Sequence, residues 1–138
     1  MTDPSAYQSW TLAGAVFLVL TSVTHSVAGE RFLITPMLRL RGNAVLEHWL
    51  ARIVIRFAWH LTSLTWVMIA ILLLTVGTVR VDPTMAILGI FGVGFLVAGV
   101  FDMFISRGQH IGWPLLAATG TCLLAARSVA PPIYVVFY

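Results

Sequence analysis

The class of this protein follows from one continuous stretch, residues 44–76, which reads AVLEHWLARIVIRFAWHLTSLTWVMIAILLLTV. As a single α-helix this stretch would measure about 50 Å, at a rise of about 1.5 Å per residue. Its acidic and basic residues, Glu47, Arg52 and Arg56, all lie in the first half, and residues 57–76 contain none. About 20 apolar residues are enough to cross the roughly 30 Å hydrocarbon core of a bilayer. We therefore expect a membrane-spanning helix whose first turns project beyond the hydrocarbon.

Three further apolar runs accompany this stretch. The four predicted helices are residues 7–28, 44–76, 84–106 and 111–129. Apolar residues make up 59% of the chain and charged residues only 9%, whereas a soluble domain carries roughly 25% charge. This composition excludes a soluble monomer. We expect an all-α, polytopic integral membrane four-helix bundle, with residues 1–138 as a single transmembrane domain.

Prolines and capping residues set the predicted boundaries. Pro36 should prevent one uninterrupted helix through residues 29–42, because a proline ring disrupts a helix interior. The same segment mixes Arg31, Arg39 and Arg41 with apolar residues, so we expect this connection to lie in the headgroup region. Asp82 followed by Pro83 is typical of a helix start. The pair of prolines at residues 131–132 should end the last helix.

The arginines predict the orientation in the membrane. All basic residues are arginines, and lysine is absent. One end of the bundle carries Arg31, Arg39, Arg41, Arg52, Arg56 and Arg107, whereas the opposite end carries only Arg80 and Arg127. By the positive-inside rule we expect the arginine-rich end to be cytoplasmic and both termini to lie outside. An arginine-rich, lysine-free composition suggests a GC-rich bacterial genome, hence the inner membrane with periplasmic termini.

Several function classes find no support in the sequence. The arginines form no stripe interleaved with exposed aromatic residues, so we expect no nucleic-acid partner. Cys122 is the only cysteine, which excludes an internal disulfide, and its apolar neighbours favour a buried packing role. The Gly-Val-Gly run of residues 92–94 lies within a predicted membrane helix, so it is interpreted as a packing feature and not as a phosphate loop.

Most of the unusual polar residues fall at the arginine-rich end. These residues are His25, Glu30, His48, Arg52, Arg56, His60, Asp102 and His110. Positions 48, 52, 56 and 60 are four residues apart, so they advance by about 40° per step around a helix and share an arc of about 120°. Ionisable groups at membrane depth normally face the bundle interior and have partners there.

The arginine-based interpretation assigns a ligand site to Arg52, Arg56, His60 and Asp102. Guanidinium groups donate several hydrogen bonds and stay charged when partly dehydrated. Such a cytoplasm-facing pocket would bind an anionic or lipid-like ligand, or help an ion or a proton across the membrane. The plainer alternative is a structural ion pair between Arg56 and Asp102, because intramembrane charges also pair for stability.

The histidine-based alternative is a metal or haem redox protein. Imidazoles are common metal ligands, and His25, His60, His110 and Asp102 would supply a four-ligand shell. The sequence has no His-x-x-x-His pair, no Glu-x-x-His motif and no Cys-x-x-Cys-His haem attachment. The cofactor therefore stays open.

A further alternative is a non-catalytic accessory subunit of a larger membrane complex. Gly89, Gly92, Gly94 and Gly99 permit close helix approach, which predicts tight packing in the bundle or a homo-oligomer. Membrane lipids and further membrane subunits are the expected partners. The sequence leaves open whether the protein is an enzyme.

Overall fold

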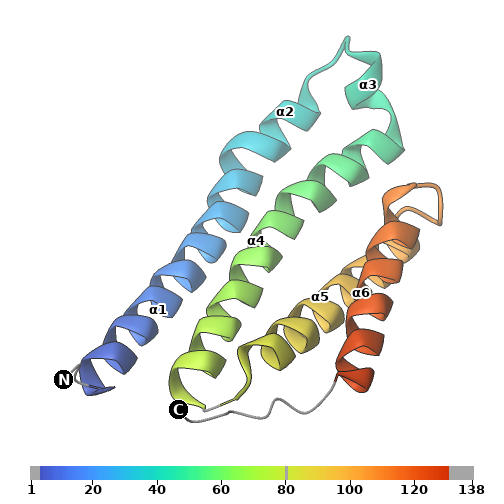
Figure 1. Cartoon of the computed structure of the whole chain (residues 1–138). Coiled ribbons are helices and arrows are strands. Elements are labelled where there is room, and N and C mark those ends of the chain that lie inside the picture. The colour runs from blue at the N-terminus through green and yellow to red at the C-terminus, as the bar shows by residue number, and fades with distance from the viewer. Residues whose placement is uncertain (1–3, 80, 131–138) are drawn as a thin grey trace.

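The computed structural model describes residues 4–79 and 81–130, and this part of the chain contains helices and short connections but no strand. In chain order the elements are α1 (Pro4–Gly29), η1 (Glu30–Ile34), α2 (Thr35–Arg39), α3 (Ala44–Glu47), α4 (Trp49–Thr78), α5 (Pro83–Ile105) and α6 (Gly112–Val129). Figure 1 shows α1 beside α4 as one antiparallel pair and α5 beside α6 as a second. The expected all-α class is confirmed.

Within the described residues, three helical segments are long and apolar enough to cross a membrane: Ala6–Arg39, Trp49–Thr78 and Pro83–Ile105. They would measure about 50, 45 and 35 Å, against a hydrocarbon core of about 30 Å. Helix α6 has 18 residues, would measure about 27 Å, and is not one of the three. The fourth predicted span is therefore a shorter helix, which packs along α5.

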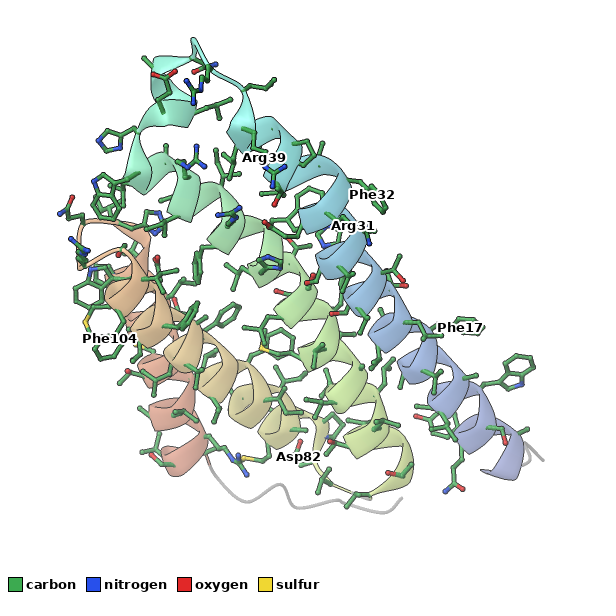
Figure 2. All side chains as sticks on the ribbon, turned by 180° about the vertical axis from the view of Figure 1, so that it is seen from behind. Phe17, Arg31, Phe32, Arg39, Asp82 and Phe104 are labelled. Carbon is green, nitrogen blue, oxygen red and sulfur yellow. The ribbon has the colours of Figure 1, made fainter. Side chains whose placement is uncertain are left out.

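The lateral surface of the molecule is apolar, as a surface against lipid must be. Phe17, Phe32 and Phe104 are 69%, 73% and 71% exposed, and Figure 2 shows them directed outward from the helices. Cys122 is likewise exposed on α6, which corrects the buried role expected for it. Apolar sequence neighbours do not distinguish a core position from a lipid-facing one, because lipid tails are as apolar as leucine.

The first helix does not end before Gly29 but continues to Arg39 through a π-helical turn. In η1 the backbone N–H of Thr35 donates to the carbonyl of Glu30, five residues earlier. Pro36 lies in the first turn of α2, directly after this turn. Proline lacks an N–H and its ring clashes with the carbonyl four residues before it, and a π-turn is one way for a helix to accommodate such a disruption. The connection to the second helix is thereby reduced to residues 40–43.

The second predicted helix is divided at His48. Asn43 caps α3 by accepting hydrogen bonds from the backbone N–H groups of Val45 and Leu46. His48 then has an extended backbone, with φ −72° and ψ 124°, and precedes α4 as its N-cap. His48 is exposed and does not continue the helical arc predicted for it together with residues 52, 56 and 60.

The start of α5 agrees with the sequence pattern. The carboxylate of Asp82 accepts a hydrogen bond from the backbone N–H of Thr84 at 2.7 Å, and Pro83 occupies the first helical turn. The turn to α6 contains Arg107 and Gly108 with φ of 54° and 74°. Glycine adopts positive φ without steric cost, so Gly108 suits this reversal.

The four-helix bundle that we expected is not confirmed, because the described helices pack mainly as two pairs. Contact is extensive between α1 and α4 and between α5 and α6, but it is smaller between α4 and α5. Among the described residues α1 has no extensive contact with α5 or α6. The main helices therefore follow one another in the order α1, α4, α5, α6 (Figure 1), with a groove between α4 and α5.

The glycines of α5 make contacts inside the chain. A Cβ at Gly99 would lie 2.5 Å from the backbone nitrogen of Ala117 in α6, and a Cβ at Gly120 of α6 would overlap the backbone of Leu96. Gly94 instead accommodates the side chain of Met68 from α4. These positions explain the close approach of α5 and α6 without a second protomer. A homo-oligomer stays a prediction, now without the support of an uncovered glycine surface.

Candidate functional site: a polar cluster between α1 and α4

Polar side chains from both helices of the first pair meet at their interface. We call Ser22, His25, Ser26, Glu30, Thr35, Arg56, His60 and Ser63 the α1–α4 polar cluster. Residues 22, 25, 26 and 30 share one face of α1 and η1, and residues 56, 60 and 63 share one face of α4, because helix positions three or four apart are neighbours. The antiparallel packing of α1 against α4 brings the two faces together.

An ion pair lies at the arginine-rich end of the cluster. Arg56 donates from Nε to Oε1 of Glu30 at 2.9 Å, and Thr35 donates from its hydroxyl to the same oxygen at 2.7 Å. Glu30 is the first residue of the π-turn η1, and Thr35 is the first residue of α2, so these two elements position the carboxylate and the hydroxyl. The prediction that Arg56 pairs with Asp102 is therefore wrong, because Glu30 from the neighbouring helix occupies that role.

A chain of polar contacts continues from this pair toward the middle of the helices. The Nε2 atom of His60 lies 3.5 Å from Oε2 of Glu30, and its Nδ1 atom lies 3.0 Å from the hydroxyl of Ser26. Ser26 donates to the hydroxyl of Ser63 at 2.9 Å, which in turn lies 3.0 Å from Nδ1 of His25. The order of contacts is Glu30, His60, Ser26, Ser63 and His25.

Two tryptophans hold His25 at the inner end of this chain. The imidazole stacks on the indole of Trp59, with ring centroids 4.1 Å apart and planes 5° apart. Trp66 meets the same imidazole edge-on, at 4.8 Å and 71°. The indole N–H of Trp59 also donates to the backbone carbonyl of His25 at 3.1 Å. These contacts orient the imidazole so that Nδ1 faces Ser63.

One oxygen of Glu30 is buried without a hydrogen bond in the described part of the chain. Oε1 accepts from Arg56 and Thr35, whereas Oε2 has only the long 3.5 Å approach of His60. A buried polar atom without a partner is rare, and in a native structure it calls for an explanation. Its nearest polar neighbour, Nε2 of His60 at 3.5 Å, is beyond the usual hydrogen-bond distance.

Asp102 and His110 form a separate pair at the turn between α5 and α6. Asp102 is fully buried, and its Oδ2 lies 2.5 Å from Nδ1 of His110. The hydroxyl of Ser106 donates to the backbone carbonyl of Asp102 at 2.6 Å, and Phe57 of α4 meets the His110 ring edge-on. This pair ties the end of α5 to the start of α6, and Oδ1 of Asp102 has no hydrogen bond in the described part of the chain.

The predicted ligand set is divided among three places. Arg56 and His60 belong to the α1–α4 polar cluster, and Asp102 belongs to the pair with His110. Arg52 donates to the backbone carbonyls of Leu38 at 2.6 Å and Leu46 at 3.2 Å. It therefore satisfies carbonyls at the end of α2 and in α3, and it does not form a clamp with Arg56.

The predicted metal set is divided in the same way. His25 and His60 lie at different points of the α1–α4 polar cluster, whereas His110 and Asp102 lie at the turn between α5 and α6. Among residues 4–79 and 81–130, no three histidine, cysteine, aspartate or glutamate side chains converge in a way that would hold a metal ion. A shared end of the molecule is thus not a shared site.

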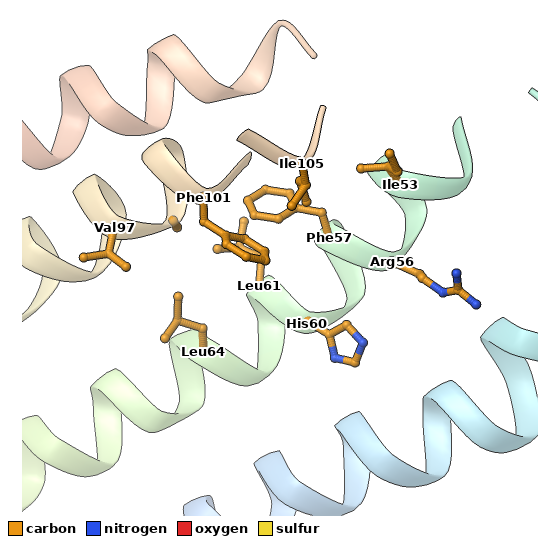
Figure 3. Close-up of a pocket in the computed structure, with 10 residues that line it drawn as sticks. Ile53, Arg56, Phe57, His60, Leu61, Leu64, Val97, Phe101 and Ile105 are labelled. Carbon is orange, nitrogen blue, oxygen red and sulfur yellow. The ribbon is translucent and has the colours of Figure 1, made fainter. Parts of the chain in front are cut away.

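A pocket of about 490 Å³ opens beside the cluster, between α4 and α5. Its wall is almost entirely apolar, with Phe57, Leu61 and Phe101 among its lining residues. Arg56 and His60 border the pocket, but Figure 3 shows their polar ends turned toward the α1 side. The pocket therefore offers an apolar surface, and the hydrogen-bonding groups serve the α1–α4 interface.

The sequence contained a signal for the serines of this site, which we had not assigned to it. Ser22, His25 and Ser26 repeat at the spacing of one helix face, and Glu30 continues that face into η1. Serines are often interpreted as bonding back to their own helix, which is what Thr21 does with the carbonyl of Phe17. Whether a serine of α1 bonds to its own helix or to α4 depends on its position opposite Ser63 of α4.

Comparison with known proteins adds no assignment to this geometry. No family model matches the chain, and no curated protein or solved structure matches it at a significant level.

Proposed function

We propose that this protein relays protons within the membrane, along the α1–α4 polar cluster from Glu30 to His25. The observation that supports the proposal is a series of proton-carrying groups: an imidazole, two hydroxyls and a second imidazole joined by hydrogen bonds, with the Glu30 carboxylate 3.5 Å from the first imidazole. Each of these groups accepts a hydrogen bond in one state and donates one in another. Chains of acidic and histidine residues inside membranes are typical of proton relays in pumps and transporters.

The length of the relay is set by its register on α4. Residues 56 and 63 are seven positions apart, or about 10 Å along the helix axis. If the hydrocarbon begins near Val54, His25 lies near the middle of a core of about 30 Å. The relay thus connects one membrane surface with the mid-plane, and the positive-inside rule makes that surface cytoplasmic. The lysine-free, arginine-rich composition favours a bacterial inner membrane.

One chain supplies only part of a path across the membrane. Beyond Ser22 the described contacts between α1 and α4 are mostly apolar, with Ala15 and Ala70 buried and Leu73 lying against Gly14. The hydroxyl of Thr11, which packs over Gly77, bonds to its own helix. Protons that reach His25 are therefore passed to a membrane partner or to a protonatable molecule in the bilayer. The apolar wall of the groove argues against a headgroup clamp at Arg56. The separation of the histidines argues against a metal centre.

The test uses His25 as the terminal proton acceptor and its two tryptophans as reporters. Stacking on Trp59 and Trp66 makes indole fluorescence sensitive to the charge of the imidazole. A variant with Trp10, Trp49 and Trp113 changed to Phe retains only these two reporters. In lipid nanodiscs, a rapid drop in pH should quench the fluorescence at the rate at which protons reach His25.

Ser26→Ala removes the hydroxyl that links His60 to Ser63 and should slow the quenching at least 10-fold. The matched control is Ser128→Ala, which removes a hydroxyl that, among the described residues, bonds to its own helix at Ala125, and it should leave the rate unchanged. Thermal melting of both variants separates a relay from a purely structural role. Equal quenching rates for Ser26→Ala and Ser128→Ala would overturn the proposal, whatever their stabilities.

A further inference from the structure

A second pocket, of about 580 Å³, continues the groove between α4 and α5 toward the opposite end of the molecule. It shares Leu64 and Val97 with the first pocket, so the two form one groove along these helices. On α5 its lining extends from Met85 to Val97, which is about 18 Å of helix. That length is close to the depth of one leaflet, about half of the 30 Å hydrocarbon core.

An arginine from α6, the fourth of the main helices, enters this groove. Arg127 lies in the last turn of α6 and lines the pocket together with Thr75 of α4. Its guanidinium passes over Gly89 of α5, where any Cβ would overlap Nη1. The missing side chain at Gly89 is therefore what lets Arg127 reach past α5 into a groove that is otherwise apolar.

The charge of Arg127 is not compensated by the described part of the chain. Among residues 4–79 and 81–130 its guanidinium has no hydrogen bond and no ion pair, although the other cation at a groove, Arg56, is paired with Glu30. Arg127 is exposed at the rim of an apolar groove, an arrangement that complements a ligand with an anionic head and an apolar tail. The planar fork of arginine suits a phosphate, to which it donates two parallel hydrogen bonds.

We propose that the groove between α4 and α5 binds one anionic phospholipid. The phosphate contacts Arg127 at the membrane surface, and one acyl chain lies along the pocket from Met85 to Val97. Charge complementarity selects the headgroup, and the length of the apolar wall matches a chain that crosses one leaflet. On α4 this pocket extends from Leu64 to Thr75, beyond the polar cluster along the helix, and it contains none of the relay residues, so it does not depend on the proton relay.

Native mass spectrometry of the detergent-solubilised protein tests the proposal, with phosphatidylglycerol as the probe. The wild-type protomer should bind one phosphatidylglycerol, and Arg127→Gln should weaken this binding about 10-fold. Val93→Trp should also weaken it, because Val93 is exposed and lines the groove. The matched control Arg107→Gln removes the same charge from the α5–α6 turn, where Arg107 lies over the ring of Trp49, and should have no effect.

Each alternative occupant gives a different result in the same measurement. A second copy of the chain in the groove would appear as a dimer that Val93→Trp dissociates, without bound lipid. A free fatty acid that binds as tightly as phosphatidylglycerol would exclude a phospholipid site. If Arg127→Gln and Arg107→Gln weaken phosphatidylglycerol binding equally, the binding depends on the net charge of the protein and not on a site at Arg127. Any of these results overturns the proposal, and circular dichroism shows whether each variant is folded.

Discussion

Methionine in place of Arg56 removes the cation that is paired with Glu30. The geometry of the pair gives an estimate of the free energy of unfolding that is lost. Two unit charges about 4 Å apart attract by roughly 4 kcal/mol at an effective dielectric constant of about 20. The two side chains are 43% and 30% exposed, and a long side chain near the helix end can shift its charge toward the headgroups. We therefore reduce the expected coupling between Arg56 and Glu30 to about 2 kcal/mol.

The test is a double-mutant cycle of Arg56→Met, Glu30→Met and both together. Each single change leaves one charge without its partner and should lower the free energy of unfolding by about 2 kcal/mol. The double variant replaces the pair by two apolar side chains of similar length, so it should lose no more than one single variant. Reversible unfolding in mixed detergent micelles measures the free energy of unfolding of all four proteins.

A second cycle serves as the control, with Arg56→Met and Asp102→Leu. These residues belong to separate pairs, so their effects should add to within about 0.5 kcal/mol. The reasoning is refuted if the Arg56 and Glu30 changes are additive within the same limit. It is also refuted if coupling appears between Arg56 and Asp102, because the helices would then pack in a different register.

Three further outcomes follow from the fold. Gly99→Ala should destabilise the protein by about 2 kcal/mol, because the added Cβ overpacks against the backbone of α6. The control Gly14→Ala places a Cβ 4.0 Å from one methyl group, so it should change stability much less in the same unfolding assay. His110→Leu should cost about 3 kcal/mol by leaving the buried carboxylate of Asp102 unpaired, and thermal melting equal to that of the wild type would contradict this. Reporter fusions within residues 40–43 and at the amino terminus should lie in opposite compartments, and signals from the same side would exclude a transmembrane first helix.

Local sequence was sufficient for most of the helix boundaries. Asp82 and Pro83 start α5 as expected, because a capping carboxylate and a proline act within a single turn. The proline rule failed at Pro36, since a π-turn beginning at Glu30 lets the helix continue to Arg39. It also failed to predict the break at His48, where neither glycine nor proline marks the end of α3.

The candidate site was predicted in part. Arg56 and His60 were correctly taken as neighbours on one helix face, because positions four apart always share a face. Their partners were not predicted correctly, since Glu30 and Asp102 are both acids near the same end of the molecule. A choice between two such acids depends on which helix packs against α4 at that face, and that information is not local.

The sequence by itself determined the all-helical class, the presence of helices apolar enough to cross a membrane, their approximate bounds and the concentration of polar residues at one end. Those properties follow from composition and from the 3.6-residue period, which act along a single helix. Only the tertiary structure decided the pairing of Glu30 with Arg56, the order of groups from His60 to His25, and the path of Arg127 over Gly89. The physical reason is that contacts between helices depend on the order, rotation and register of the helices. A helix face against lipid and a helix face against another helix favour the same apolar residues, so the sequence does not distinguish them.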